Sequence, residues 1–143
     1  MTSIHILLVE DNEGDILLTT EALEDGRIKN SISVVTDGEQ AMQYLHKTGA
    51  HLNARDPDLI LLDVNLPKHN GHEVLQNIKS TEALKHIPVI MLTTSSSEKD
   101  IMDSYKNFAN CYITKPVHVS DFMKAVAQIE DFWINIVSLP KRN

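Results

Sequence analysis

The sequence contains very little cysteine and no long hydrophobic segment. Cys111 is the only cysteine among 143 residues, which excludes an internal disulfide bond and a cysteine-rich metal site. The longest apolar runs have four residues (6–9, 59–62 and 89–92), whereas a membrane-spanning helix needs about 20. No basic segment precedes the first apolar run, which argues against a secretory leader. We therefore expect a cytoplasmic protein that does not enter the membrane.

Positive charge, aromatic side chains and nucleotide-binding motifs are also scarce. The formal net charge is −7, which argues against nucleic acid as a partner because nucleic-acid-binding domains present a basic face. Aromatic residues make up 5% of the chain, which leaves little to stack a flavin. Neither a G-x-G-x-x-G motif nor a P-loop is present. A globular domain that binds neither nucleic acid nor a nucleotide cofactor is the remaining interpretation.

Short apolar runs alternate with longer amphipathic segments five times along the chain. This alternation predicts an α/β domain, with parallel strands joined by helices in a doubly wound sheet. The predicted strands are 5–9, 32–35, 59–62, 89–92 and 111–114, and the predicted helices are 14–24, 39–46, 71–79, 98–107 and 120–137. One domain spans residues 1–143, with a core over about 4–130, and the connection 46–58 is expected to be a surface loop.

The last predicted helix carries one apolar stripe over four turns. Its members recur at steps of four and three residues: Phe122, Val126, Ile129, Trp133 and Ile136. Packing on the sheet accounts for the first half of the stripe. The segment 131–143 extends beyond what one sheet face requires, so plain core and a self-association surface both remain open for it.

Polar side chains stand at the ends of four of the predicted strands. Asp63 directly follows an apolar run, Glu10 and Asp11 close the first strand, Thr93 follows the fourth, and Lys115 follows the fifth. In a parallel sheet these ends share one edge, where open α/β sheets bind ligands. A helix cap or a loop acid is the plainer interpretation of Asp63 taken by itself, but the other strand ends argue against it.

Three carboxylates gathered at one edge repel each other unless a cation is present. Oxygen ligands without a convergent histidine or thiolate suit Mg²⁺. Zinc is the poorer alternative, because His69 and His72 lie three residues apart without a thiolate or an acid at metal-site spacing.

A carboxylate beside Mg²⁺, a lysine and a threonine is suited to receive a phosphoryl group. Asp63 would attack phosphorus as the nucleophile. Mg²⁺ and Lys115 would neutralise charge on the phosphoryl oxygens, and Thr93 would donate a hydrogen bond to one of them. The product adds negative charge and acceptor oxygens, which can reorder a nearby loop.

This arrangement resembles the receiver domain of two-component response regulators, the CheY-like family, over nearly the whole chain. Thr93 lies thirty residues after Asp63, and Lys115 lies twenty-two residues after Thr93, as in that family. Pro67 and Gly71 complete the family's D-x-x-x-P-x-x-x-G pattern. The resemblance implies the strand order 2-1-3-4-5 and five helices around the sheet.

The resemblance also implies roles for individual residues. Asp11 and Asp63 would bind Mg²⁺ directly with the backbone carbonyl of Asn65, and Glu10 would act through water. Tyr112 would be the aromatic switch that turns inward when Thr93 moves toward the phosphoryl group. A cis peptide bond is implied before the proline that follows the lysine.

Among receivers, the chain is most similar to the stand-alone regulators that partner phytochrome histidine kinases. The similarity rests on 110–115, on 92–95, on the long loop before Asp63 and on the aromatic C-terminal segment. Pro116 departs from the serine that many of these regulators have after the lysine. The resemblance implies dimers through the helix 4–strand 5–helix 5 face and the C-terminal extension, with Phe132, Trp133 and Ile136 at the interface.

The sequence thus predicts a single-domain response regulator rather than an enzyme. Its expected partners are a sensor histidine kinase, of the phytochrome type by resemblance, a second copy of the chain, and a downstream phosphotransfer protein. Two alternatives stay open. One is a pseudo-receiver that binds partners without phosphorylation. The other is an aspartyl-phosphate hydrolase, although Asn65 occupies the position where such enzymes need a second acid.

Overall fold

A parallel β-sheet forms the centre of the computed structural model, which describes residues 3–26, 28–94, 109 and 111–127. Its five strands run in the order β2-β1-β3-β4-β5, which confirms the predicted fold. The strands are β1 (Ile4–Val9), β2 (Asn30–Val35), β3 (Leu59–Asp63), β4 (Val89–Thr93) and β5 (Cys111–Thr114). The described helices are α1 (Glu13–Asp25), α2 (Gly38–His46), α3 (Gly71–Ser80) and α5 (Val119–Ala127), with a 3-10 helix, η1 (Gly49–His51).

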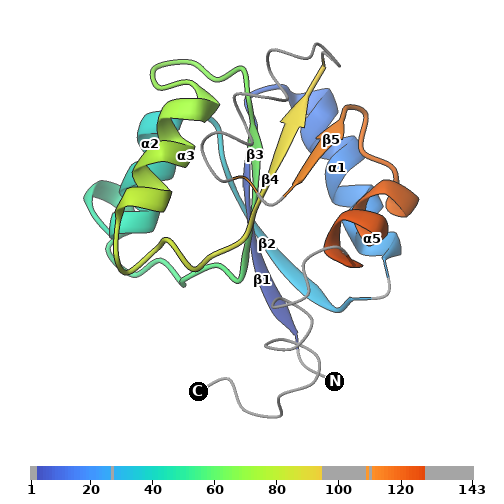
Figure 1. Ribbon diagram of the computed structural model, residues 1–143, viewed down its shortest axis with the longest axis horizontal. Helices are drawn as coiled ribbons and strands as arrows, with labels where there is room; N and C mark the ends of the chain where they lie inside the picture. Colours follow the sequence, from blue (N-terminus) through green and yellow to red (C-terminus); the bar gives the residue numbers. More distant parts are fainter. Residues whose placement is uncertain (1–2, 27, 95–108, 110, 128–143) are drawn as a thin grey trace.

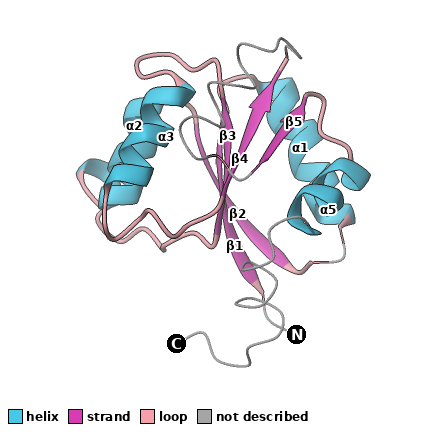
Figure 2. Ribbon diagram, viewed as in Figure 1, coloured by secondary structure: helices cyan, strands magenta, loops and turns pink. Residues whose placement is uncertain are grey.

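Helices cover both faces of the sheet, as Figures 1 and 2 show. Helices α1 and α5 pack side by side on one face, and α2 and α3 pack on the other. Each face encloses its own apolar core. Strand β1 contributes side chains to both cores. Ile6 and Leu8 belong to the core beneath α1 and α5, and Leu7 and Val9 belong to the core beneath α2 and α3. This two-sided burial explains why β1 and β3 are apolar at every core position without alternation.

The register of the sheet places the carboxyl ends of its strands along one edge. Val9 pairs with Leu62, Asp63 with Leu92, and Thr93 with Thr114. The residues at these ends, and those that directly follow them, therefore gather at the same edge. The loops that leave this edge carry the candidate site.

Apart from the end of the last helix, the element boundaries agree with the sequence to within one residue, with one informative exception. Strand β2 begins at Asn30, two residues before the predicted start, because Asn30 and Ser31 pair with Ile4 and His5. Polar residues give no apolar signal, so this part of the strand is invisible in the sequence. Helix α2 is capped by Asp37, whose carboxylate accepts a hydrogen bond from the Gln40 backbone N–H at 2.7 Å.

The connection 46–58 was expected to be an irregular surface loop, and the structure places η1 within it. The predicted helix 98–107 lies outside the described residues, as does the part of the last helix beyond residue 127. Among the helices that the structure does describe, none combines the length and the apolar character needed to cross a membrane.

Candidate functional site

The predicted site residues converge at the carboxyl edge of the sheet. Asp63 is the last residue of β3, Thr93 is the last residue of β4, and Lys115 directly follows β5. Glu10 directly follows β1 and is completely buried, while Asp63 and Thr93 are each 2% exposed. Strands far apart in the sequence thus deliver an acid, a hydroxyl and an ammonium to one place.

Lys115 is the centre of a buried ion-pair network. Its Nζ lies 2.8 Å from Glu10 Oε1, 3.0 Å from Asp15 Oδ2 and 3.3 Å from Asp63 Oδ2. The lysine side chain is only 6% exposed, so these charge-assisted hydrogen bonds act with little screening by solvent. Its backbone N–H donates to the Thr93 carbonyl at 2.7 Å, which fixes the end of β5 against β4.

The turn after β3 holds Asp63 through close packing of the backbone. The Gly71 N–H donates to the Val64 carbonyl at 2.9 Å. A Cβ atom at Gly71 would lie 2.3 Å from the Asp63 carbonyl oxygen, so no other residue fits without moving the turn. The Asn65 N–H donates to Asp63 Oδ1 at 3.1 Å, which orients the carboxylate and leaves Oδ2 facing Lys115.

Glu10, Asp11 and Asp63 form a group that fits a divalent metal ion. One oxygen from each of these carboxylates lies within 4.8 Å of the others. Glu10 and Asp63 are buried and Asp11 is exposed, so one side of the group is open to solvent. Hard oxygen donors with an open side suit Mg²⁺ or Mn²⁺, which keep several waters. Within the described part of the chain, no histidine or cysteine joins such a group, and His69 pairs with Glu73 instead, at 3.5 Å.

The pKa values of Glu10 and Lys115 are both raised, for different reasons. Burial raises the pKa of Glu10 to about 7, and the nearby Asp63 carboxylate adds to this while Lys115 opposes it. Burial by itself would lower the pKa of Lys115, but hydrogen bonds to Glu10 and Asp15 and the Asp63 charge outweigh burial and raise that pKa. Lys115 is therefore a permanent cation.

Asp15 is a member of this network that the sequence analysis missed. It lies in the first turn of α1, where its backbone N–H donates to the side chain of the helix cap Asn12 at 2.9 Å. Acids in the first turn of a helix are common because they favour the positive end of the helix dipole. The sequence signal was therefore ordinary, and only the structure shows the contact with Lys115.

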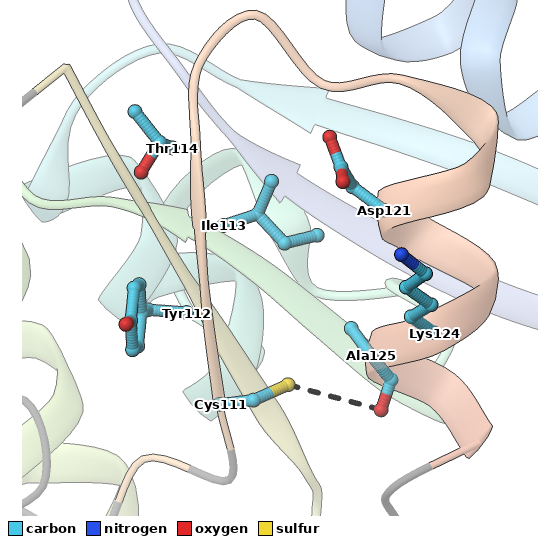
Figure 3. A pocket seen from close by; sticks show the side chains of 7 residues that line it. All are labelled: Cys111, Tyr112, Ile113, Thr114, Asp121, Lys124 and Ala125. Atoms are coloured by element: carbon cyan, nitrogen blue, oxygen red, sulfur yellow. Dashed lines mark hydrogen bonds between the residues drawn. The ribbon is translucent and has the colours of Figure 1, made fainter. Parts of the chain in front are cut away.

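Tyr112 and Cys111 point to opposite sides of β5, as Figure 3 shows. Tyr112 packs at the edge of the core that α2 and α3 cover, while the Cys111 Sγ lies 3.8 Å from the Ala125 carbonyl of α5. Cys111 is a buried core residue, and burial raises the pKa of its thiol to about 11. Asn65 is exposed next to Asp63. Phe132, Trp133 and Ile136 lie outside the described residues.

The arrangement of these residues matches that of a known family. Residues 6–127 match the model of the response regulator receiver domain. The chain belongs to this receiver family. Response regulator Rcp1 of Synechocystis sp. is 46% identical to it over 135 residues, which cover 94% of this chain and 92% of Rcp1.

Solved structures of receivers superpose on this one over nearly its whole length. The phosphorylated cyanobacterial phytochrome response regulator RcpA has 48% identity and a TM-score of 0.79, with 97% of this chain and 99% of RcpA covered. The Mn(2+)-bound form of Rcp1 has 45% identity and a TM-score of 0.77, with 96% of this chain and 99% of Rcp1 covered. The bacteriophytochrome response regulator AtBRR has 44% identity and a TM-score of 0.84, with 93% and 96% covered.

Proposed function

We propose that this receiver accepts a phosphoryl group on Asp63 from the phosphohistidine of a sensor kinase, with Mg²⁺ as the cofactor. The observation that carries the proposal is the position of Asp63. Its buried carboxylate lies 3.3 Å from the Lys115 ammonium and belongs to the carboxylate group that fits a divalent metal. A nucleophile placed between a fixed cation and a metal site is what phosphoryl transfer requires.

In the transfer step, one Asp63 carboxylate oxygen forms a bond to phosphorus as the bond from phosphorus to the donor imidazole nitrogen breaks. The electron pair of that bond returns to the imidazole. Lys115 donates an N–H to a phosphoryl oxygen, and the Thr93 hydroxyl donates to another. A Mg²⁺ ion held by Asp11, Asp63 and the Asn65 carbonyl, with Glu10 acting through water, would offset charge on the phosphoryl oxygens.

Thr93 and Tyr112, which lie on adjacent strands, would then change position in response to the added negative charge on Asp63. Met91 pairs with Tyr112 and Thr93 pairs with Thr114. A movement of Thr93 toward the phosphoryl group would therefore also displace β5. We place the output of the signal on the surface around β5 and α5, where Tyr112 would turn inward. Signalling would then pass to a partner protein or to a downstream phosphotransfer protein.

Incubation with acetyl phosphate and Mg²⁺, followed by intact-mass measurement, tests the acceptor role. We expect a gain of one phosphoryl group that disappears in Asp63→Asn and when Mg²⁺ is chelated. Absence of the gain in the unaltered chain would contradict the proposal and favour the pseudo-receiver alternative. Sustained hydrolysis of a generic phosphomonoester would instead support the aspartyl-phosphate hydrolase, since a receiver without enzymatic turnover shows none.

The partner is a histidine kinase of the phytochrome type in this proposal, because the similar proteins Rcp1, RcpA and AtBRR include regulators whose names refer to phytochromes. Phosphotransfer from a purified phytochrome kinase, compared with transfer from an unrelated histidine kinase, tests this choice. Faster transfer from the phytochrome kinase supports it, and equal rates contradict it.

We also propose a homodimer through the C-terminal segment, with Phe132, Trp133 and Ile136 at the interface. The apolar stripe of the sequence supports this arrangement. Light scattering of the full chain and of a version ending before Asp131 should give a dimer and a monomer. A monomer in both would contradict the proposed interface. The cytoplasmic location and the single-domain organisation remain predictions.

A further inference from the structure

Asp15 takes one of the N–H donors of Lys115, the cation that a phosphoryl group on Asp63 would contact. An ammonium has three N–H donors, and in this structure Lys115 faces three carboxylates, of Glu10, Asp15 and Asp63. The contacts with Glu10 and Asp15, at 2.8 and 3.0 Å, are shorter than the 3.3 Å contact with Asp63. Glu10 and Asp15 therefore hold the ammonium more closely than Asp63 does, on the side away from the place where a phosphoryl group would attach.

Asp15 differs from the other two acids in its place within the site. It is not a member of the carboxylate group that fits a metal, which consists of Glu10, Asp11 and Asp63. Its side chain is 26% exposed, against 0% for Glu10 and 3% for Asp63. Its backbone is fixed by α1 through the Asn12 cap. Asp15 is therefore held by the helix, and its carboxylate serves Lys115 rather than the metal.

We propose that Asp15 is a positioning residue that holds Lys115 toward α1 in the unphosphorylated protein and thereby weakens the hold of the site on a phosphoryl group. The inference rests on the proposed function. Two effects act in the same direction. Asp15 engages a lysine donor, and it adds a negative charge beside the place where further negative charge accumulates on phosphorylation.

The test measures the affinity of the full chain for beryllium trifluoride, a stable mimic of the phosphoryl group, by isothermal titration calorimetry at saturating Mg²⁺. Asp15→Asn keeps the shape of the side chain and removes its charge. We expect this variant to bind the mimic roughly three- to tenfold more tightly, the range for removal of one partly exposed charge. Saturation with Mg²⁺ is confirmed separately for each variant, so that a change in metal affinity does not enter the result.

Two further variants separate this role from general effects of charge. Glu13→Gln removes the same charge from the same exposed helical turn without a contact to Lys115 in the structure, and we expect its affinity to stay near that of the unaltered chain. Asp15→Glu restores the charge and should return the affinity toward the unaltered value. Support for the positioning role requires tighter binding in Asp15→Asn than in Glu13→Gln.

Unchanged or weaker binding in Asp15→Asn would overturn the inference while leaving the phosphoacceptor role intact. An equal gain in Glu13→Gln would also overturn it, because the effect would then be one of net charge. Failure of the unaltered chain to bind the mimic at all would instead contradict the proposed function, and this inference with it.

Discussion

At the scale of a single residue, Gly71 controls the position of Asp63. A methyl group there would meet the Asp63 carbonyl oxygen at 2.3 Å and the Val64 Cα at 2.8 Å, and both are backbone atoms that cannot swing away. The backbone of Asp63 must therefore move if Gly71 gains a side chain. The glycine is required by close approach and not by a left-handed conformation.

We expect Gly71→Ala to lower the free energy of unfolding by about 1–3 kcal/mol, the usual cost of overpacking. Urea denaturation measures this change. Gly14→Ala is the matched control, because its Cβ would meet only the side-chain oxygen of the exposed Asn12, at 3.2 Å, and its effect should be small. Equal effects of the two substitutions would show that the turn after β3 is not tightly packed.

His5 is a buried polar residue on β1, at the opposite edge of the sheet from Asp63. Its Nδ1 lies 2.8 Å from the Ser31 hydroxyl and its Nε2 lies 2.8 Å from the Tyr44 hydroxyl. Nε2 also lies 3.0 Å from the Ser33 hydroxyl, and the Tyr44 hydroxyl donates to the Arg55 carbonyl at 2.8 Å. Both ring nitrogens of His5 therefore have hydroxyl partners within hydrogen-bonding distance.

Burial, assisted by the Arg55 charge and opposed by Asp58, lowers the pKa of His5 below its ordinary value of 6.5. As the pH falls through 6.5, the unfolded chain takes up a proton at His5 before the folded chain does. His5 therefore contributes a decrease in the free energy of unfolding between about pH 7.5 and about pH 5.5, while Glu10, whose pKa is raised, acts in the opposite direction in every variant. We expect the contribution of His5 to be lost in His5→Gln, so that this variant is destabilised less than the unaltered chain over the same fall in pH. Denaturant titrations at several pH values measure these slopes, with the exposed His86→Gln as control. A slope unchanged by His5→Gln would contradict this account.

At the scale of the element, helix α3 begins directly beside Asp63. Asn70 accepts a hydrogen bond from the Glu73 N–H at 3.0 Å, and the Glu73 carboxylate accepts one from the Asn70 N–H at 3.3 Å. This reciprocal pair satisfies two backbone donors at the start of the helix. It fixes the end of the turn that carries Asp63.

We expect Asn70→Ala to lower the free energy of unfolding by about 1 kcal/mol, because the Glu73 N–H loses its acceptor. Thermal unfolding followed by circular dichroism measures the loss. Asn70→Asp keeps an acceptor at the same position and should remain close to the unaltered protein. An equal loss in both variants would mean that the side-chain oxygen is not what stabilises the helix start.

The elements also show how far the sequence predicts this structure. The apolar runs of β1, β3 and β4 are buried on both faces, so composition revealed them directly. The sequence did not predict the start of β2, because Ser31 there is polar and forms a hydrogen bond with His5 instead of packing in an apolar core. At the site, the sequence predicted Asp63, Thr93 and Lys115 because each lies at the end of a predicted strand. Parallel strands of one sheet bring such residues to the same edge. Asp15 was missed because its contact depends on how α1 is rotated, and an acid in a first helical turn gives no sign of that.

At the scale of the whole molecule, the carboxylates at the sheet edge oppose folding unless cations offset them. Lys115 supplies one positive charge to Glu10, Asp15 and Asp63, while Asp11 is close to two of these acids. A divalent ion that binds only the folded chain shifts the folding equilibrium toward it. Stability should therefore depend on metal concentration.

We expect Mg²⁺ at roughly ten to a hundred times its dissociation constant to raise the free energy of unfolding by about 1.4 to 2.7 kcal/mol. Denaturant titrations with and without Mg²⁺ measure the gain, and Asp11→Asn should lose most of it. The control for screening is a buffer without Mg²⁺, in which NaCl is added to the same ionic strength. An equal gain from NaCl would show that screening, rather than a bound ion, is responsible.

The pairing of Glu10 with Lys115 joins residues 105 positions apart, and this separation matters while the chain is being made. During synthesis Glu10, Asp11 and Asp15 are made first, Asp63 follows, and Lys115, whose ammonium balances these acids, is made last. For most of synthesis the growing polypeptide thus carries the negative half of the site without its lysine. The complete ion-pair network can therefore form only after Lys115 has been made, because one lysine from the end of the fold joins acids from its beginning.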